Sequence, residues 1–151
     1  MEKIKIMLVD DEERFLFTTQ KLLSKKGYDV LTASSGADAL ETLETHNIHV
    51  VILDVKMPGM DGIAALKEIK RRFPLVEVIM LTGHATVESA IDGLKSGATD
   101  YLMKPVGIEE LTNKAEEAYE KRQRVEEKIR VAQTRRFMKS PRTILKESES
   151  A

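Results

Sequence analysis

The sequence contains no cysteine, which excludes a fold held together by disulfide bonds. Its hydrophobic runs are all much shorter than the roughly 20 residues that a membrane-spanning helix needs. No small-residue cleavage pattern follows the amino-terminal Met1, so we expect no signal peptide. The formal net charge of −1 gives no reason to expect binding to nucleic acid or to a membrane. The expectation is therefore a soluble cytoplasmic protein.

The chain does contain enough hydrophobic material for one ordinary core, because 42% of its 151 residues are hydrophobic. Its charge is unevenly distributed. Residues 1–119 hold 14 Lys and Arg against 20 Asp and Glu, whereas residues 120–151 hold 10 against 5. We expect one globular domain over residues 1–120 and a basic extension over residues 121–151. The extension should begin as a helix and end as a flexible tail, without an output domain.

Short apolar runs alternate with segments of helical period, and glycine or proline marks the helix ends, as at Gly27, Pro74 and Gly97. The expected strands cover residues 3–9, 28–33, 50–53, 77–81 and 100–103. The expected helices cover about 12–26, 37–44, 63–73, 86–96 and a long segment from 108. The buried face of the first helix is expected to hold Phe15, Thr19, Leu22 and Leu23.

This alternation predicts an α/β fold of the doubly wound type, in which right-handed crossovers connect a parallel sheet covered by helices on both faces. The run over residues 50–53 consists only of Val, Ile and Leu, as is typical of a strand buried on both faces. In such sheets, ligands bind beyond the carboxyl ends of the strands. That edge is where functional residues should gather.

Polar side chains follow four of these runs, at the point where each strand is expected to end. They are Asp10 with Asp11, Asp54, Thr82 and Lys104. Clustered carboxylates repel one another and are relieved by a hard divalent cation. Mg²⁺ commonly uses one or two carboxylates together with phosphate oxygens. The sequence therefore predicts a Mg²⁺ site that handles phosphate.

A carboxylate in such a site can attack phosphorus and form an aspartyl phosphate, provided that positive groups and donors neutralise the developing charge. Asp54 is the candidate nucleophile because it stands alone after its strand. Lys104 would supply the positive charge and Thr82 a hydroxyl donor. Taken singly, an Asp-Asp pair is typical of a helix cap and a Lys-Pro pair of a turn. Their joint occurrence at four strand ends favours the phosphate site.

These residues stand in motifs that resemble the receiver domains of bacterial two-component response regulators, over about residues 3–120. The motifs are Val9-Asp10-Asp11-Glu12, Leu53-Asp54-Val55-Lys56-Met57-Pro58-Gly59-Met60-Asp61-Gly62, Leu81-Thr82-Gly83-His84 and Tyr101-Leu102-Met103-Lys104-Pro105. The stretch from Leu81 to Thr86 further resembles nitrogen-regulation-type activators. The resemblance implies a flavodoxin-like, CheY-like fold of five strands in the order 2-1-3-4-5 with five helices.

The same resemblance implies that Asp54 accepts a phosphoryl group from a sensor histidine kinase. Mg²⁺ would be held by Asp11, Asp54, the backbone carbonyl of Lys56 and, through water, Asp10. The domain would catalyse only its own Mg²⁺-dependent phosphorylation and dephosphorylation, and would not otherwise be an enzyme.

A switch is also implied by the resemblance. Thr82 and Tyr101 would respond to the phosphoryl group and remodel the face formed by the helix over 86–96, the strand over 100–103 and the helix from 108. Lys56 and His84 would tune dephosphorylation. The peptide bond between Lys104 and its proline would be cis.

The function expected is that of a stand-alone receiver, which binds a downstream protein or passes its phosphoryl group to a histidine phosphotransfer protein. A receiver fragment of a longer transcription activator stays open as the alternative, although the sequence is expected to be complete. An enzyme of the haloacid-dehalogenase type is disfavoured. Enzymes of that class carry an Asp-x-Asp motif after the first strand. Here Asp54 follows the third strand, and the next residues, Val55 and Lys56, do not supply the second acid. His46 and His49 lack metal-ligating companions and are interpreted as structural.

Two sets of residues recur every seven positions from the expected last helix into the basic extension. This spacing lets the last helix continue toward Met138. The sets are Leu111, Ala118, Val125 and Ala132, and Ala115, Arg122, Ile129 and Arg136. Two arginines interrupt the second apolar seam that a stable coiled coil needs, so a solvated helix is favoured over self-association. A weak homodimer through this helix, or through the switch face, remains a candidate. No helix-turn-helix fits in the tail, so nucleic acid is not an expected partner.

Overall fold

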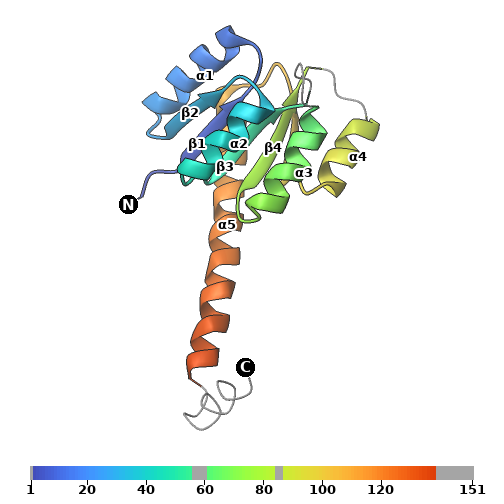
Figure 1. Cartoon of the computed structure of the whole chain (residues 1–151). Helices are drawn as coiled ribbons and strands as arrows, with labels where there is room; N and C mark the ends of the chain where they lie inside the picture. Colours follow the sequence, from blue (N-terminus) through green and yellow to red (C-terminus); the bar gives the residue numbers. More distant parts are fainter. Residues whose placement is uncertain (1, 56–60, 84–86, 139–151) are drawn as a thin grey trace.

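A computed structural model of the chain describes residues 2–55, 61–83 and 87–138. Five parallel strands form one sheet in the order β2-β1-β3-β4-β5, and helices pack on both of its faces (Figure 1). The strands are β1 (Lys5–Val9), β2 (Asp29–Ala33), β3 (Val50–Asp54), β4 (Glu77–Thr82) and β5 (Asp100–Met103). The helices are α1 (Glu13–Lys25), α2 (Gly36–Thr45), α3 (Gly62–Arg72), α4 (Val87–Lys95) and α5 (Ile108–Phe137). The expected doubly wound α/β fold and its strand order are confirmed.

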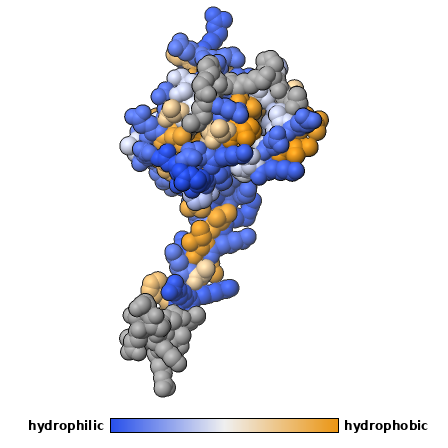
Figure 2. All heavy atoms as spheres, turned by 45° about the vertical axis from the view of Figure 1, so that its right-hand side comes forward, coloured by the Kyte–Doolittle hydropathy of each residue, from blue (hydrophilic) through white to orange (hydrophobic). Residues whose placement is uncertain are grey.

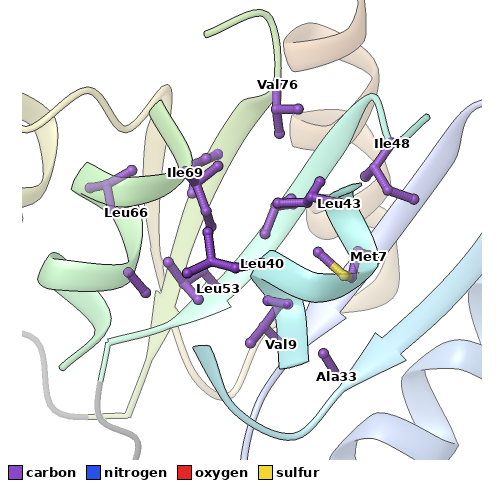
Figure 3. Packing of buried hydrophobic residues seen from close by; sticks show 14 of the residues in the cluster. Met7, Val9, Ala33, Leu40, Leu43, Ile48, Leu53, Leu66, Ile69 and Val76 are labelled. Atoms are coloured by element: carbon purple, nitrogen blue, oxygen red, sulfur yellow. The ribbon is translucent and has the colours of Figure 1, made fainter. Parts of the chain in front are cut away.

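The apolar strands alternate their side chains between two cores, one on each face of the sheet. In β1, Met7 and Val9 face the core beneath α2 and α3 (Figure 3). Ile6 and Leu8 face the core beneath α1 and α5. Because both faces are covered, strands such as β3 need apolar residues at every position. This explains why the central strands are uninterrupted runs of Val, Ile and Leu.

The face that α1 buries differs from the one expected. Leu16, Thr19 and Leu23 are buried, while Leu22 is 43% exposed and Phe15 is half-buried. Leu16 and Leu23 lie seven residues apart, so they share one side of the helix, and Leu22 lies about 100° away from Leu23. Both sides of α1 carry large apolar residues, and the spacing therefore did not identify the buried one.

The helix ends follow local chemistry. The Ser35 side chain accepts the backbone N–H of Asp38 at 3.1 Å and caps α2, and Asp61 caps α3 by accepting the N–H of Ile63 at 3.2 Å. Gly27 and Gly97 have φ angles of 99° and 110° just after α1 and α4. Glycine adopts these positive values without steric cost, so the two helices end where they were expected to end.

Helix α5 is continuous for 30 residues and leaves the body as a single rod (Figure 1). Up to Ala118 its buried residues pack under the sheet. The projecting part carries hydrophilic side chains with hydrophobic ones between them (Figure 2). Within the described ranges, no helix is long and apolar enough to cross a membrane.

His49 lies at the amino edge of the sheet and is 5% exposed. Its Nδ1 accepts the backbone N–H of Lys5 at 2.9 Å, and its ring packs edge-on against Tyr119 of α5, with centroids 5.0 Å apart. Burial and then the charge of Arg122 lower the pKa of His49, with Lys5 adding to this. Glu2 and Glu126 act in the opposite direction. The side chain therefore favours the neutral form that its hydrogen bond requires.

This environment predicts a pH dependence of stability. Because the pKa of His49 is lower in the folded chain, its stabilising effect is complete above the usual histidine pKa of about 6.5 and is lost as the pH falls below that value. We expect the free energy of unfolding, measured with urea, to drop more in wild type than in His49→Asn between pH values of about 7.5 and 5.5. The asparagine amide oxygen keeps an acceptor near the position of Nδ1.

His46→Asn, at an exposed position, is the matched control and should keep the wild-type dependence. Equal losses in wild type and His49→Asn would contradict the assignment.

Candidate functional site

The sheet register brings the polar residues to one edge. Val9 pairs with Leu53, and Asp54 pairs with Leu81, so the residues at the carboxyl ends of β1, β3 and β4 lie next to one another. β1 and β3 are also the strands between which the direction of winding reverses. In open α/β sheets, this is where ligands bind.

Three carboxylates form a cluster at this edge. Asp10, Asp11 and Asp54 each offer an oxygen, and these oxygens all lie within 4.8 Å of one another. Asp10 and Asp54 are buried, with 1% and 6% exposure, while Asp11 faces solvent. A set of carboxylate oxygens at such separations, open on one side, suits a hard divalent cation.

Lys104 reaches from the end of β5 into this cluster. Its Nζ donates to Asp10 Oδ2 at 2.6 Å and lies 3.4 Å from Glu12 Oε1. Burial lowers the pKa of Lys104, but the hydrogen bond and charge of Asp10, with further contributions from Asp54 and Glu12, outweigh it and raise the pKa. Lys104 is thus firmly cationic at neutral pH and offsets part of the negative charge.

The position of Lys104 depends on its backbone and on Phe15. Its backbone N–H donates to the Thr82 carbonyl at 2.8 Å, which extends the pairing of β4 with β5. The bond to Pro105 is cis, as expected. The ammonium lies 4.3 Å from the centre of the Phe15 ring, a contact that favours a cation. Phe15 was expected only as a core residue, and its role beside Lys104 had no signal in the sequence.

The two expected switch residues lie on neighbouring strands. Thr82 ends β4 and is 1% exposed, while Tyr101 is half-buried on β5. The Tyr101 hydroxyl is 3.0 Å from Ser89 Oγ on α4. Tyr101 therefore links α4 to β5, and β4 lies between β5 and the strands that carry the acid cluster. Ser89 was not anticipated from the sequence.

Gly62 is a further residue that the motif analysis treated only as a turn. Its N–H donates to the Val55 carbonyl at 2.9 Å. A Cβ at position 62 would lie 2.5 Å from Val55 Cα and 2.7 Å from the Asp54 carbonyl oxygen. Only glycine allows the start of α3 to pass this close to the backbone that carries Asp54. The sequence did contain a signal for this role, because Gly62 directly follows Asp61, the aspartate that caps α3.

Two expected site residues, Lys56 and His84, lie outside the described residues. The other expected residues are placed at the same edge of the sheet or on the strands leading to it. The arrangement of buried and exposed carboxylates, a cationic lysine and a buried threonine can hold a divalent cation and a phosphoryl group side by side.

Comparisons with known proteins agree with this geometry. The family model of the response regulator receiver domain matches residues 6–116. The chain is 42% identical over 117 residues to the transcriptional regulatory protein ZraR of Escherichia coli K12, an alignment that covers 78% of this chain and 26% of that protein. It is 36% identical over 118 residues to the DNA-binding transcriptional regulator NtrC of the same organism, covering 78% and 25%.

A solved structure is similar as well. The response regulator receiver domain protein from Clostridium thermocellum superposes with a TM-score of 0.76 at 40% identity, covering 81% of this chain and 98% of that one. The chain thus spans about a quarter of the curated relatives that it matches and nearly the whole of this receiver structure.

The close approach at Gly62 predicts a sensitive position. Gly62→Ala should lower the free energy of unfolding by about 1–3 kcal/mol, since either the start of α3 or the backbone at Asp54 must move. Urea unfolding measures this loss. Gly83→Ala is the matched control, because no atom lies within 4 Å of a Cβ at that position. Similar stability of the two variants would show that the contact is easily relieved.

Proposed function

Because the chain belongs to the response regulator receiver domain family, we propose that it accepts a phosphoryl group on Asp54 from a sensor histidine kinase and so switches the binding of a partner protein. Receiver domains of response regulators interact with histidine kinases. The observation that carries the proposal is the position of Asp54, a buried carboxylate inside the acid cluster with Asp10 and Asp11 and within the electrostatic influence of Lys104.

In the proposed reaction, a carboxylate oxygen of Asp54 attacks the phosphorus of a phosphohistidine. The O–P bond forms as the P–N bond breaks, and the imidazole leaves with the bonding electron pair and takes up a proton. Lys104 neutralises one phosphoryl oxygen and the Thr82 hydroxyl donates to another. Hydrolysis of the aspartyl phosphate resets the domain. The chain acts on its own side chain alone, so we do not class it as an enzyme.

The acid cluster fits Mg²⁺, which takes oxygen ligands and commonly combines carboxylates with phosphate. Asp11 and Asp54 would bind directly and Asp10 through water, with the carbonyl of Lys56 as a further ligand. The bound cation would supply neutralisation of the phosphoryl oxygens. The hydrogen bond from Lys104 compensates part of the negative charge of Asp10, which is consistent with binding of Asp10 through water rather than directly.

The partner surface that we propose is the face of α4, β5 and α5. Four large apolar side chains on α4 and β5 are exposed there, namely Val87 (77%), Ile91 (44%), Leu94 (48%) and Met103 (57%). The first three recur at helical spacing, so they form one stripe, and exposed apolar stripes are typical of protein-binding surfaces. Thr82 and Tyr101 would couple this face to Asp54 by shifting its population between two arrangements.

The wider context of the receiver has two candidates. In the first, it acts alone on a downstream protein, a histidine phosphotransfer protein or a second copy in a weak homodimer. In the second, it is the receiver part of a longer transcription activator. The relatives named as transcriptional regulators, of which the chain spans about a quarter, support the second candidate. Nucleic acid and membrane are not proposed as partners of the receiver itself.

Loss of the acceptor tests the central step. Wild type incubated with Mg²⁺ and acetyl phosphate should gain about 80 Da, the mass of one phosphoryl group, in intact mass spectrometry, and Asp54→Asn should gain none. The exposed Asp92→Asn is the matched control and should behave as wild type. Circular dichroism verifies that each variant is folded. An undiminished gain in Asp54→Asn would refute the assignment.

Removal of the lysine tests the electrostatics of the site. Lys104→Met should bind Mg²⁺ more tightly than wild type, by about tenfold or about 1.4 kcal/mol, because a positive charge no longer opposes the cation. Isothermal calorimetry measures the affinity. Lys114→Met is a control, since this lysine pairs with Asp100 at 3.0 Å, outside the acid cluster. Weaker binding in Lys104→Met would mean that Lys104 organises the carboxylates instead of opposing the cation.

A further inference from the structure

Arg122 is buried at the point where α5 leaves the body, with 8% of its surface exposed. Its place in the sequence suggested an arginine that interrupts an apolar seam. It lies beyond residues 6–116, the part that matches the receiver family. A buried arginine is costly unless its donors are satisfied, so its partners identify what it does.

The guanidinium of Arg122 joins α5 to the segment that precedes β3. One NH₂ group donates to the Ile48 carbonyl at 2.6 Å and the other to Asn47 Oδ1 at 3.3 Å. Nε donates to Glu126 Oε1 at 2.8 Å, one turn further along α5. The planar fork of arginine makes all three contacts at once, which a lysine cannot do. Arg122 therefore ties the last turn on the body to the first turn beyond it.

Neighbouring residues of α5 attach to other parts of the same edge. Lys121 Nζ lies 3.5 Å from Glu77 Oε2 at the start of β4, and the buried Glu77 also accepts the hydroxyl of Thr99. Tyr119 packs on the ring of His49. Successive helical residues point about 100° apart, so these contacts hold the helix from more than one direction.

Beyond Arg122 the helix has little other support. Residues 123–137 are exposed except for the half-buried Val125, and they extend for about 22 Å at 1.5 Å per residue. A separate helix of this length would be marginal in water, because forming its first turn is unfavourable. Continuation from a fixed turn removes that cost. The segment should therefore be as straight and as well directed as the turn from which it grows.

We propose that Arg122 is the anchor that makes residues 123–137 a rigid arm, held in a fixed direction relative to the receiver body. The proposal concerns the mechanical link between body and arm and does not depend on phosphorylation. A protein segment that follows or binds the arm would then be positioned by the body. Any rotation of α5 at the sheet would be carried along the arm.

The absence of cysteine allows spin labels to be placed on introduced cysteines alone. One label is placed at Lys67 on α3 and the other at Gln133 on the arm, both exposed positions. A second pair, Lys67 with Asn113, reports on the part of α5 that lies on the body. Double electron–electron resonance measures the distance distribution of each pair. The full chain with wild-type Arg122 should give a narrow distribution for both pairs.

Arg122→Ala should broaden the distribution of the Lys67–Gln133 pair by roughly twofold or more and leave the Lys67–Asn113 pair unchanged. Alanine favours helix formation, so broadening cannot come from lower helix propensity. Arg124→Ala is the matched control, because Arg124 is exposed and has no hydrogen-bond or ion-pair partner in the part of the chain that the structure describes. It should leave both distributions narrow.

Arg122→Lys supplies a second test. It keeps the positive charge but loses the fork, so it should also broaden the arm pair and not the body pair. The proposal is overturned if the arm pair stays narrow in Arg122→Ala, since the arm is then held without the anchor. It is equally overturned if both pairs broaden together, because Arg122 would then stabilise the whole domain and not the arm.

Discussion

Repulsion among three carboxylates at one edge of the sheet is the constraint on which the site depends. Parallel strands of similar register end together, so the fold places one carboxylate oxygen each of Asp10, Asp11 and Asp54 within 4.8 Å of the others. Burial of two of them strengthens the repulsion. Lys104, fixed by its backbone bond to Thr82, relieves part of it through Asp10. The remaining negative charge would favour a bound cation, and the cation would in turn admit a phosphoryl group.

The fold was largely predictable because short apolar runs and segments of helical period alternate clearly along the chain. Strands buried on both faces are uninterrupted apolar runs, and glycine at positions such as Gly27 adopts without steric cost the positive φ that ends a helix. The side of α1 that faces the core was not predictable, because Leu16 and Leu22 are equally apolar and only the packing of the whole sheet distinguishes them. Pattern identifies an element well, but it identifies the buried side of an element poorly when both sides are apolar.

Some residues of the candidate site were likewise predictable from the sequence and others were not. Residues at strand ends were identifiable because topology alone brings them together. Phe15 and Ser89 were not, since each acts through a contact between elements whose mutual position no local pattern contains. Arg122 is the clearest example. The sequence indicated only an arginine that interrupts an apolar seam, yet Arg122 is buried because the carbonyl of Ile48 and the side chain of Asn47 lie within its reach.

The position of Arg122 has a consequence for how many molecules the domain can hold at once. The acid cluster lies at the carboxyl edge of the sheet, whereas Arg122 donates a hydrogen bond to the Ile48 carbonyl just before β3, at the amino edge. The carboxyl edge of the sheet therefore lies at the opposite end of the body from the point where α5 departs (Figure 1). The phosphoryl donor proposed for Asp54 and a protein bound to the arm would therefore contact different ends of the domain. Phosphoryl transfer to Asp54, as proposed above, would then not require release of a protein bound to the arm.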